Sequence, residues 1–273
     1  MQRRPIIVGV DGSDPGYAAV TWAAREAAHR RAPLRIVHVM DGHTAAPAGH
    51  DDRSHVEAAW SESNALVDEA TRRAANAAPD VSVRADSLLG RPLERLWELA
   101  GRAELMVVGY RGRGGFAGMR LGSVGERVAR RAPCPVAVVR GHPAVRGPVV
   151  AGIDDSPVAD AVLGTAFQSA ADRACDLVVI HAAAEKARVE EQTAPWRPKY
   201  PRVPVEVRLT RADPGPALEQ ASAGAQLVVV GSRGRDYLRS VLLGSTGLHL
   251  LRHADCPVLI ARPNEPREFH RTM

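Results

Sequence analysis

The chain has 273 residues, is 45% hydrophobic and carries a formal net charge of +5. This length predicts about two domains. No apolar run approaches the roughly 18 residues that a membrane-spanning helix requires, and the apolar run near the N-terminus is too short for a signal peptide. We therefore expect a cytoplasmic protein that does not bind a membrane. The basic residues are nearly all arginines spread beside Glu and Asp, which predicts a mixed-charge surface rather than a nucleic-acid site.

Strand and helix patterns alternate along the first half of the chain. Short continuous apolar runs are typical of buried parallel strands, and Ser13 or Asp14 is suited to cap the helix after the first of them. The expected strands are 6–10, 34–39, 81–87, 105–108 and 136–139, and the expected helices are 14–31, 56–78, 92–101 and 122–131. Such alternation predicts a parallel sheet with right-handed crossovers and helices on both faces.

The second half repeats the first. The segment 6–13 matches 149–156 at an offset of 143 residues, whereas the later segments match at an offset of 122. The second copy has therefore lost 21 residues after its second strand. We expect the proline-rich remainder, 183–203, not to form two full helical turns. Further strands or helices are expected at 205–210, 216–222, 227–230, 244–253 and 258–261.

These patterns predict an α/β protein of two tandem Rossmann-like domains, each a five-stranded parallel sheet with helices on both faces. The first domain is expected to cover 1–143 and the second 144–263, followed by a loose tail at 264–273. Ligands of such sheets bind outside the carboxyl ends of the strands, where the strand order reverses.

A glycine-rich motif follows the fourth strand of each copy. Its spacing is G-x2-G-x9-G-S, at Gly109, Gly112, Gly122 and Ser123, and it returns at Gly231, Gly234, Gly244 and Ser245. Glycines before a helix start favour phosphate binding, because bare N–H groups can approach the anion and the helix N-terminus attracts negative charge. We expect glycine there because a side chain would block the anion or because φ is positive. No lysine follows these glycines, so a Walker A loop is excluded.

Cysteines and histidines suggest no metal site. Cys134 and Cys256 each precede a proline at equivalent positions, and no pair of cysteines has metal-ligand spacing. We expect buried thiols in a reducing compartment. His38 and His181 are expected to be packed strand histidines rather than catalytic groups.

The motif, the opening Val-Gly-Val-Asp-Gly-Ser and the closing Ala-Pro-Cys-Pro-Val-Ala-Val-Val together resemble the universal stress protein family in its tandem form. The resemblance covers nearly the whole chain and implies an adenine nucleotide alpha hydrolase-like fold that binds ATP, with Mg²⁺ at the phosphates. Asp11 would lie beside the adenosine, and the Val39 backbone would contact adenine. The implied first site is Gly9, Asp11, Val39, Gly109, Arg111, Gly112, Gly122, Ser123 and Val124. The implied second site is Gly152, Asp154, Ala182, Gly231, Arg233, Gly234, Gly244, Ser245 and Thr246.

The resemblance implies a nucleotide-dependent regulator or sensor in the stress response, acting on an unknown protein partner. Neither crevice shows a nucleophile–base pair or a carboxylate pair for metal-assisted chemistry, so we expect no primary catalytic role. A slow ATPase or other ATP-using enzyme and an interaction protein with a vestigial crevice are the alternatives. In the second loop Asp236 replaces Gly114, which disfavours phosphate unless a nearby arginine neutralises it.

The last strand of each copy resembles the family's edge strands, which pair across domains. An apolar edge left unpaired would promote aggregation. We therefore expect the two copies to pack against each other, and we expect a homodimer.

Overall fold

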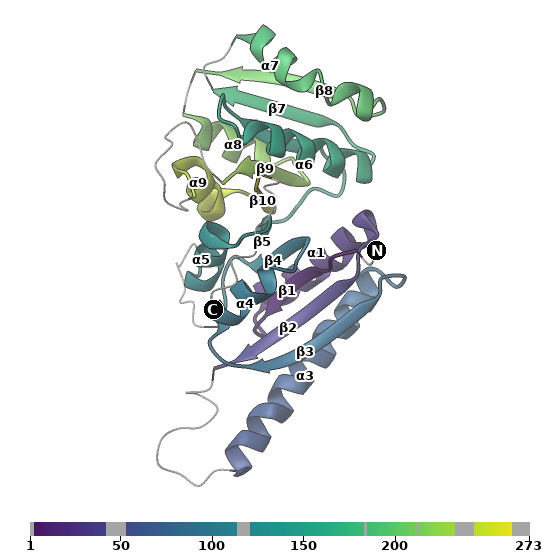
Figure 1. Ribbon diagram of the computed structural model, residues 1–273, viewed down its shortest axis with the longest axis vertical. Coiled ribbons are helices and arrows are strands. Elements are labelled where there is room, and N and C mark those ends of the chain that lie inside the picture. Colours follow the sequence, from purple (N-terminus) through teal and green to yellow (C-terminus); the bar gives the residue numbers. More distant parts are fainter. Residues whose placement is uncertain are drawn as a thin grey trace, which may run out of the picture.

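The computed structural model describes residues 3–41, 53–113, 121–182, 185–211, 213–232 and 243–263. Strands and helices alternate through these ranges (Figure 1). The strands are β1 Ile6–Val10, β2 Leu34–Met40, β3 Val83–Leu89, β4 Leu105–Gly109, β5 Val136–Val139, β6 Val149–Ile153, β7 Leu177–Ala182, β8 Val205–Thr210, β9 Leu227–Gly231 and β10 Val258–Ala261. The helices are α1 Asp14–Arg30, α3 Arg53–Ala77, α4 Pro92–Ala100, α5 Ser123–Arg131, α6 Ala159–Asp172, α7 Lys186–Thr193, α8 Pro214–Ser222 and α9 Ser245–His253, with a short 3₁₀ helix at Arg197–Lys199.

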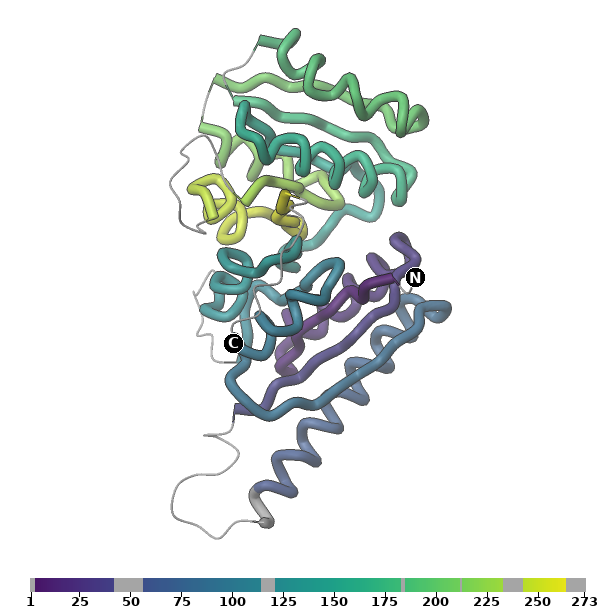
Figure 2. The backbone as a smooth tube through the Cα atoms, viewed as in Figure 1, coloured from purple at the N-terminus to yellow at the C-terminus, as the bar shows by residue number. Residues whose placement is uncertain are grey.

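The described strands form one sheet of ten, in the order β3-β2-β1-β4-β5-β10-β9-β6-β7-β8. Each half is a parallel five-stranded unit, as the sequence predicted, and its first strand lies at the centre. Strands β5 and β10 join the halves as an antiparallel pair, with Ala137 opposite Leu259. Figure 2 shows the purple-to-blue first half and the green-to-yellow second half as two blocks that meet there. The expectation that the two copies pack against each other is confirmed.

Two hydrophobic cores lie on the two faces of this sheet, and each runs through both halves. Helices α1, α3, α6 and α7 cover one face, and α4, α5, α8 and α9 cover the other. All residues of β5 and β10 are buried. The joining strands are therefore covered on both faces, as central strands of a parallel sheet are.

Two sequence expectations were wrong in detail. The third strand begins at Val83 rather than 81, because it starts in register with Leu34 of β2. The segment after β7 does form a helix of just over two turns, α7. Its prolines all lie beyond Thr193, while Lys186 and Glu190 form an i,i+4 ion pair and Val189 is fully buried. The prolines therefore end the helix without interrupting it.

The helix α3 extends beyond the sheet in Figure 1. It is 25 residues long, yet neither it nor any other described helix combines the length and the apolar character needed to cross a membrane.

Arginines at the ends of the joining strands reinforce the contact between the halves. Arg140, just after β5, donates from Nη1 to the carbonyl oxygen of Leu250 near the end of α9 at 2.9 Å. Arg262, just after β10, donates in the same way to Ala129 in α5. Each arginine thus donates to a carbonyl in the last turns of the other half's helix, where a cation is also favoured by the helix dipole.

A buried ion cluster links α1 to α6 across the same boundary. Glu26 is 1% exposed and accepts from Arg30 Nε at 2.6 Å and from Arg173 Nη2 at the end of α6. Burial raises the pKa of Glu26, but the two guanidinium groups outweigh this effect and lower the pKa from 4.5 to about 2. The carboxylate is therefore charged at any ordinary pH.

Replacing Glu26→Gln is expected to lower the free energy of unfolding by about 3–5 kcal/mol, because two nearly buried arginines lose the carboxylate that they share, and Arg30 keeps only the longer contact with Glu104, at 3.6 Å. Since the folded pKa is depressed, the stabilisation by Glu26 is complete above pH 4.5 and is lost as the pH falls from 4.5 toward 2. Urea unfolding followed by circular dichroism from pH 7 to pH 3 measures both effects. The variant should lose less stability than wild type on acidification.

Glu190→Gln, in the exposed pair on α7, is the control and should change little. Equal stability of wild type and Glu26→Gln at pH 7 would contradict the role of the cluster.

Candidate functional site

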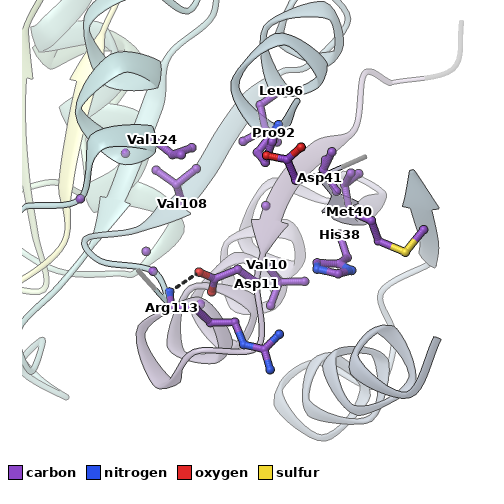
Figure 3. Close-up of a pocket in the computed structure, with 18 of the residues that line it drawn as sticks. Val10, Asp11, His38, Met40, Asp41, Pro92, Leu96, Val108, Arg113 and Val124 are labelled. Carbon is purple, nitrogen blue, oxygen red and sulfur yellow. Dashed lines mark hydrogen bonds between the residues drawn. The ribbon is translucent and has the colours of Figure 1, made fainter. Parts of the chain in front are cut away.

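A cavity of about 800 Å³ opens at the carboxyl ends of β1, β2 and β4, where the strand order of the first half reverses. Helices α3, α4 and α5 contribute the rest of its wall (Figure 3). All nine residues of the implied first site line it: Gly9, Asp11, Val39, Gly109, Arg111, Gly112, Gly122, Ser123 and Val124. The structure thus brings together residues from four separate stretches of the chain.

Asp11 holds the glycine loop against the turn after β1. One carboxylate oxygen, Oδ1, accepts from the Ser13 amide at 3.1 Å and from the Ser13 hydroxyl at 2.6 Å. The other, Oδ2, accepts from the Arg113 amide at 2.7 Å, which Figure 3 marks with a dashed line. Ser13 is the N-cap of α1, since its hydroxyl oxygen accepts from the Gly16 amide. Asp11 therefore supports the helix cap and positions the loop at the same time.

The three loop glycines are required for different reasons. A Cβ on Gly109 would lie 2.7 Å from the carbonyl oxygen of Pro15, so glycine lets β4 approach the start of α1. A Cβ on Gly112 would lie 2.3 Å from Asp11 Oδ2. A Cβ on Gly122 would meet no atom of the described residues closer than 3.4 Å. None of the three has positive φ, so that part of the sequence expectation was wrong.

The space at Gly122 lies at the N-terminus of α5. Gly122 is the N-cap, and among the described residues no side chain caps this helix. Its first N–H groups have no carbonyl partner within the helix, and Ser123, Val124 and Gly125 all line the cavity. Arg111 and Arg113 line it as well. The cavity therefore combines the N–H donors and helix dipole of α5 with cationic side chains elsewhere in its lining, which is the chemistry of an anion site.

Tyr110 connects this loop to the other half. Its ring lies under the guanidinium of Arg111, 4.7 Å from the ring centroid, and its hydroxyl accepts from Arg111 Nη2 at 2.7 Å. Arg140, which bonds to α9, lies 5.8 Å from the same ring. Ser232, at the equivalent position, is buried.

The cavity has an apolar side and a polar side. Figure 3 shows Val108, Val124, Pro92 and Leu96 on one side of the cavity and Asp11, His38 and Arg113 on the other. The mouth on the polar side carries an exposed ion pair, Arg113 Nη1 to Glu62 Oε1 at 2.9 Å.

Sequence motifs did not identify the helix-borne part of this wall. Ala59, Glu62 and Ser63 come from α3, and Pro92 and Leu96 come from α4. The amphipathic pattern of these helices marks which residues face inward but not where along the sheet each turn lies. His38 lines the cavity, so the expectation of a merely packed histidine was incomplete. His181 is fully buried, as expected.

The second half has the same topology with a rebuilt turn after its first strand. Asp155 occupies the position equivalent to Gly12 of the first half. Gly12 has a φ of +81°, whereas Asp155 does not have a positive φ. Helix α6 has no side-chain cap within the described residues, and the Ser156 hydroxyl is buried there without a partner. Asp154 Oδ1 accepts from the Ser156 amide at 3.0 Å, and Gln192 of α7 donates to the Asp154 carbonyl at 3.3 Å.

The implied second-site residues occupy the expected elements as far as they are described. Asp154 and Ala182 lie at the ends of β6 and β7, Gly152 lies within β6, Gly231 ends β9, and Gly244, Ser245 and Thr246 open α9. Arg233 and Gly234 lie outside the described residues, as does Asp236.

Comparison with known proteins identifies relatives over nearly the whole chain. A sequence model described as "Universal stress protein family" matches residues 2–140 and 182–262. Universal stress protein Rv2005c of Mycobacterium tuberculosis (strain ATCC 25618 / H37Rv) is 36% identical, over 94% of this chain and 96% of that protein. Universal stress protein Rv2623 of the same strain is 33% identical, with the same coverage. The crystal structure of a universal stress protein from Archaeoglobus fulgidus DSM 4304 matches with a TM-score of 0.76 at 18% identity, over 96% of this chain and 99% of that chain, which shows a common fold.

Replacing Asp11→Asn is expected to lower the free energy of unfolding by about 1–3 kcal/mol. The side-chain amide of asparagine has only one acceptor oxygen. Its NH₂ group must therefore face either the Arg113 amide or Ser13, and on that side two N–H donors would point at each other. Urea unfolding followed by tryptophan fluorescence measures the change. Asp68→Asn, on the exposed face of α3, is the matched control. An Asp11→Asn midpoint equal to that of the control would show that Asp11 does not hold the loop.

Proposed function

The chain belongs to the universal stress protein family, and we propose that its first crevice binds an adenine nucleotide, preferentially ATP, as the signal of a stress-response regulator. The observation that carries this proposal is that a Cβ on Gly122 would make only ordinary contacts with the described residues, at the N-terminus of α5, which no described side chain caps. Gly109 and Gly112 are already explained by packing within the protein. Gly122 is not, and it faces the donors that an anion would use.

The phosphate end of the ligand is assigned to α5. The N–H groups at Ser123 and Val124 would bond to the phosphate oxygens, and Arg111 and Arg113 line the same cavity and would contribute charge. Mg²⁺ keeps several of its waters and binds largely through substrate phosphates. The Ser123 hydroxyl is the protein group that would reach the ion.

The nucleoside end is assigned to β2 and α4. Val37, Val39 and Leu96 give this part of the cavity an apolar surface suited to the faces of a purine. A volume of about 800 Å³ falls in the range of small-molecule sites, which is roughly 300–1,000 Å³. The last residues of β2 lie beside this surface, so their backbone groups would contact the edge of the base.

A sensor role is favoured over catalysis by the bonding of two of the three described carboxylates that line the crevice, Asp11, Asp41 and Glu62. Asp11 accepts three hydrogen bonds from the protein, and Glu62 is paired with Arg113. Both groups hold parts of the structure together, whereas a general base must be available to a water or hydroxyl. We propose that the loaded loop is the surface that a protein partner recognises.

We also propose that the chain forms a homodimer through surfaces other than the joining strands. Strands β5 and β10 already pair with each other. The remaining sheet edges are β3 and β8, and Leu89 at the end of β3 and Leu209 in β8 are both exposed. Light scattering should give twice the chain mass of 29.2 kDa. A mass of one chain at working concentrations would contradict the dimer.

The direct test is to purify the protein without added nucleotide, denature it, and identify the released small molecules by chromatography and mass spectrometry. We expect an adenine nucleotide to be released. Protein freed of its nucleotide should then bind ATP again when it is titrated with and without Mg²⁺. AMP or a cyclic nucleotide in place of ATP would revise the ligand. Neither release nor binding of any nucleotide would favour the interaction protein with a vestigial crevice.

The matched variants are Gly122→Glu and Gly122→Ala. Glutamate would place a negative charge at the anion site and fill its space, so binding in the first crevice should be lost. Alanine adds a Cβ for which the described residues leave ordinary contact distance, so the protein should fold and retain ATP with reduced affinity. Unchanged ATP affinity and stoichiometry in Gly122→Glu would refute the assignment.

A further inference from the structure

A chain of four hydrogen-bonding groups ends at His38 in the wall of the crevice. His38 Nδ1 lies 2.7 Å from the Ser63 hydroxyl of α3. Ser63 donates to the Ser87 hydroxyl of β3 at 2.7 Å. Ser87 in turn donates to Asn64 Oδ1 at 3.3 Å. The chain therefore joins β2, α3 and β3 beneath the crevice.

The orientation of Asn64, with Oδ1 toward the Ser87 hydroxyl, determines which tautomer of His38 this arrangement favours. A carbonyl oxygen such as Asn64 Oδ1 can only accept, so the single hydroxyl proton of Ser87 is used there. Ser87 must then accept from Ser63, and the single proton of Ser63 is used in that bond. Ser63 is left with lone pairs only toward His38. The imidazole therefore carries its proton on Nδ1, and Nε2 is a bare acceptor.

Because Nδ1 is engaged by Ser63, Nε2 is the ring nitrogen left for a ligand. The ring lines the cavity, and Figure 3 draws it on the same side as Asp11 and Arg113. Within the described ranges the ring makes no other hydrogen bond than the one through Nδ1. A ligand in this crevice would thus meet one neutral acceptor on the polar side, close to the end of β2.

The charges around the ring favour its neutral form. Burial lowers the pKa of His38 below 6.5, and the positive charge of Arg113 lowers it further, while Asp11 and Glu62 act in the opposite direction. The ring is therefore neutral at pH 7 and can accept a hydrogen bond.

The second half lacks this arrangement. His181 stands at the position of His38, but its Nδ1 bonds to the carbonyl oxygen of Ala182 at 2.9 Å. Its side chain is fully buried, with Nε2 3.6 Å from Asp155 Oδ1. The acceptor facing a crevice is thus a property of the first half.

We propose that His38 Nε2 is a specificity-determining acceptor that selects nucleosides presenting an N–H or O–H donor at the end of β2. The donor is the exocyclic amino group of a 6-aminopurine or a hydroxyl of the ribose. This inference rests on the proposed nucleotide function and adds the group that distinguishes one nucleotide from another.

The test is calorimetric titration of wild type and His38→Leu with four ligands at pH 7.5. These are ATP, purine riboside triphosphate (which lacks the amino group), 2′-deoxy-ATP and 3′-deoxy-ATP. His38→Leu should bind ATP roughly three- to tenfold more weakly, as expected for loss of one neutral hydrogen bond. The analogue that lacks the bonded donor should bind wild type and variant equally. The identity of that analogue tells whether the base or the ribose supplies the donor.

Two further variants separate this effect from a change in folding. His142→Leu, an exposed histidine after β5, is the matched control and should bind every ligand as wild type does. Ser63→Ala removes the group that fixes the tautomer and should weaken ATP binding about two- to threefold, by a smaller factor than His38→Leu. The thermal midpoint of each variant, measured without ligand, checks that it is folded.

A pH series gives a readout that a purely structural role would not produce. Protonation turns Nε2 into a donor, so ATP should bind wild type more weakly as the pH falls through the lowered pKa of His38. Asp11, Glu62 and Arg113 also face the ring and remain in His38→Leu. The difference between the two pH profiles therefore isolates His38.

The outcomes distinguish the two proposals. ATP binding by wild type together with an equal loss, or no loss, for all four ligands in His38→Leu would overturn the role of His38 alone. No ATP binding by wild type would overturn the nucleotide function and the inference with it.

Discussion

The rest of the structure depends on the pairing of two apolar edge strands. β5 and β10 are short, consist of Val, Leu, Ile and Ala, and would each expose a row of unpaired N–H and C=O groups if the halves separated. Their antiparallel pairing satisfies both edges within one chain. It also aligns the faces of the two halves, so that each hydrophobic core continues from one half into the other.

Polar contacts on either side of the β5–β10 pair also hold the two halves together. Glu26 and Arg173 connect α1 to α6, and Arg140 and Arg262 each reach a helix of the opposite half. Tyr110 stands between Arg140 and the glycine loop. The glycine loop of the first crevice is therefore in contact, through Tyr110, with the arginine that bonds to α9 of the other half.

The repeating parts of this fold could be predicted from the sequence because periodicity and turn residues are local signals. The parallel sheet follows from alternation, and all nine implied residues of the first site lie around one cavity because strand ends in a parallel sheet meet at one edge. Helix α7 was not predicted, since its prolines lie just past its last residue. The Ser63–Ser87 bond was not predictable either, because it depends on which turn of α3 lies over which residue of β3, and that is decided by packing of the whole face.

The glycine motif combines two requirements that sequence alone does not separate. Gly109 and Gly112 are needed by the fold itself, one for the approach of β4 to α1 and the other for the contact with Asp11. A chain with this fold would keep both whether or not it held a nucleotide. Of these three glycines, only Gly122 could carry a Cβ without coming closer than 3.4 Å to a described atom. It follows that Gly231 and Gly234 are weak evidence for a second site, even though they repeat the spacing. Gly244 is the informative position in the second half, together with the turn at Asp155, where the glycine of the first copy has been replaced and α6 has lost its cap. Occupancy of the second half should therefore be judged by a Gly244→Glu variant, because Gly231 stands at the position of Gly109, where packing within the fold already requires glycine.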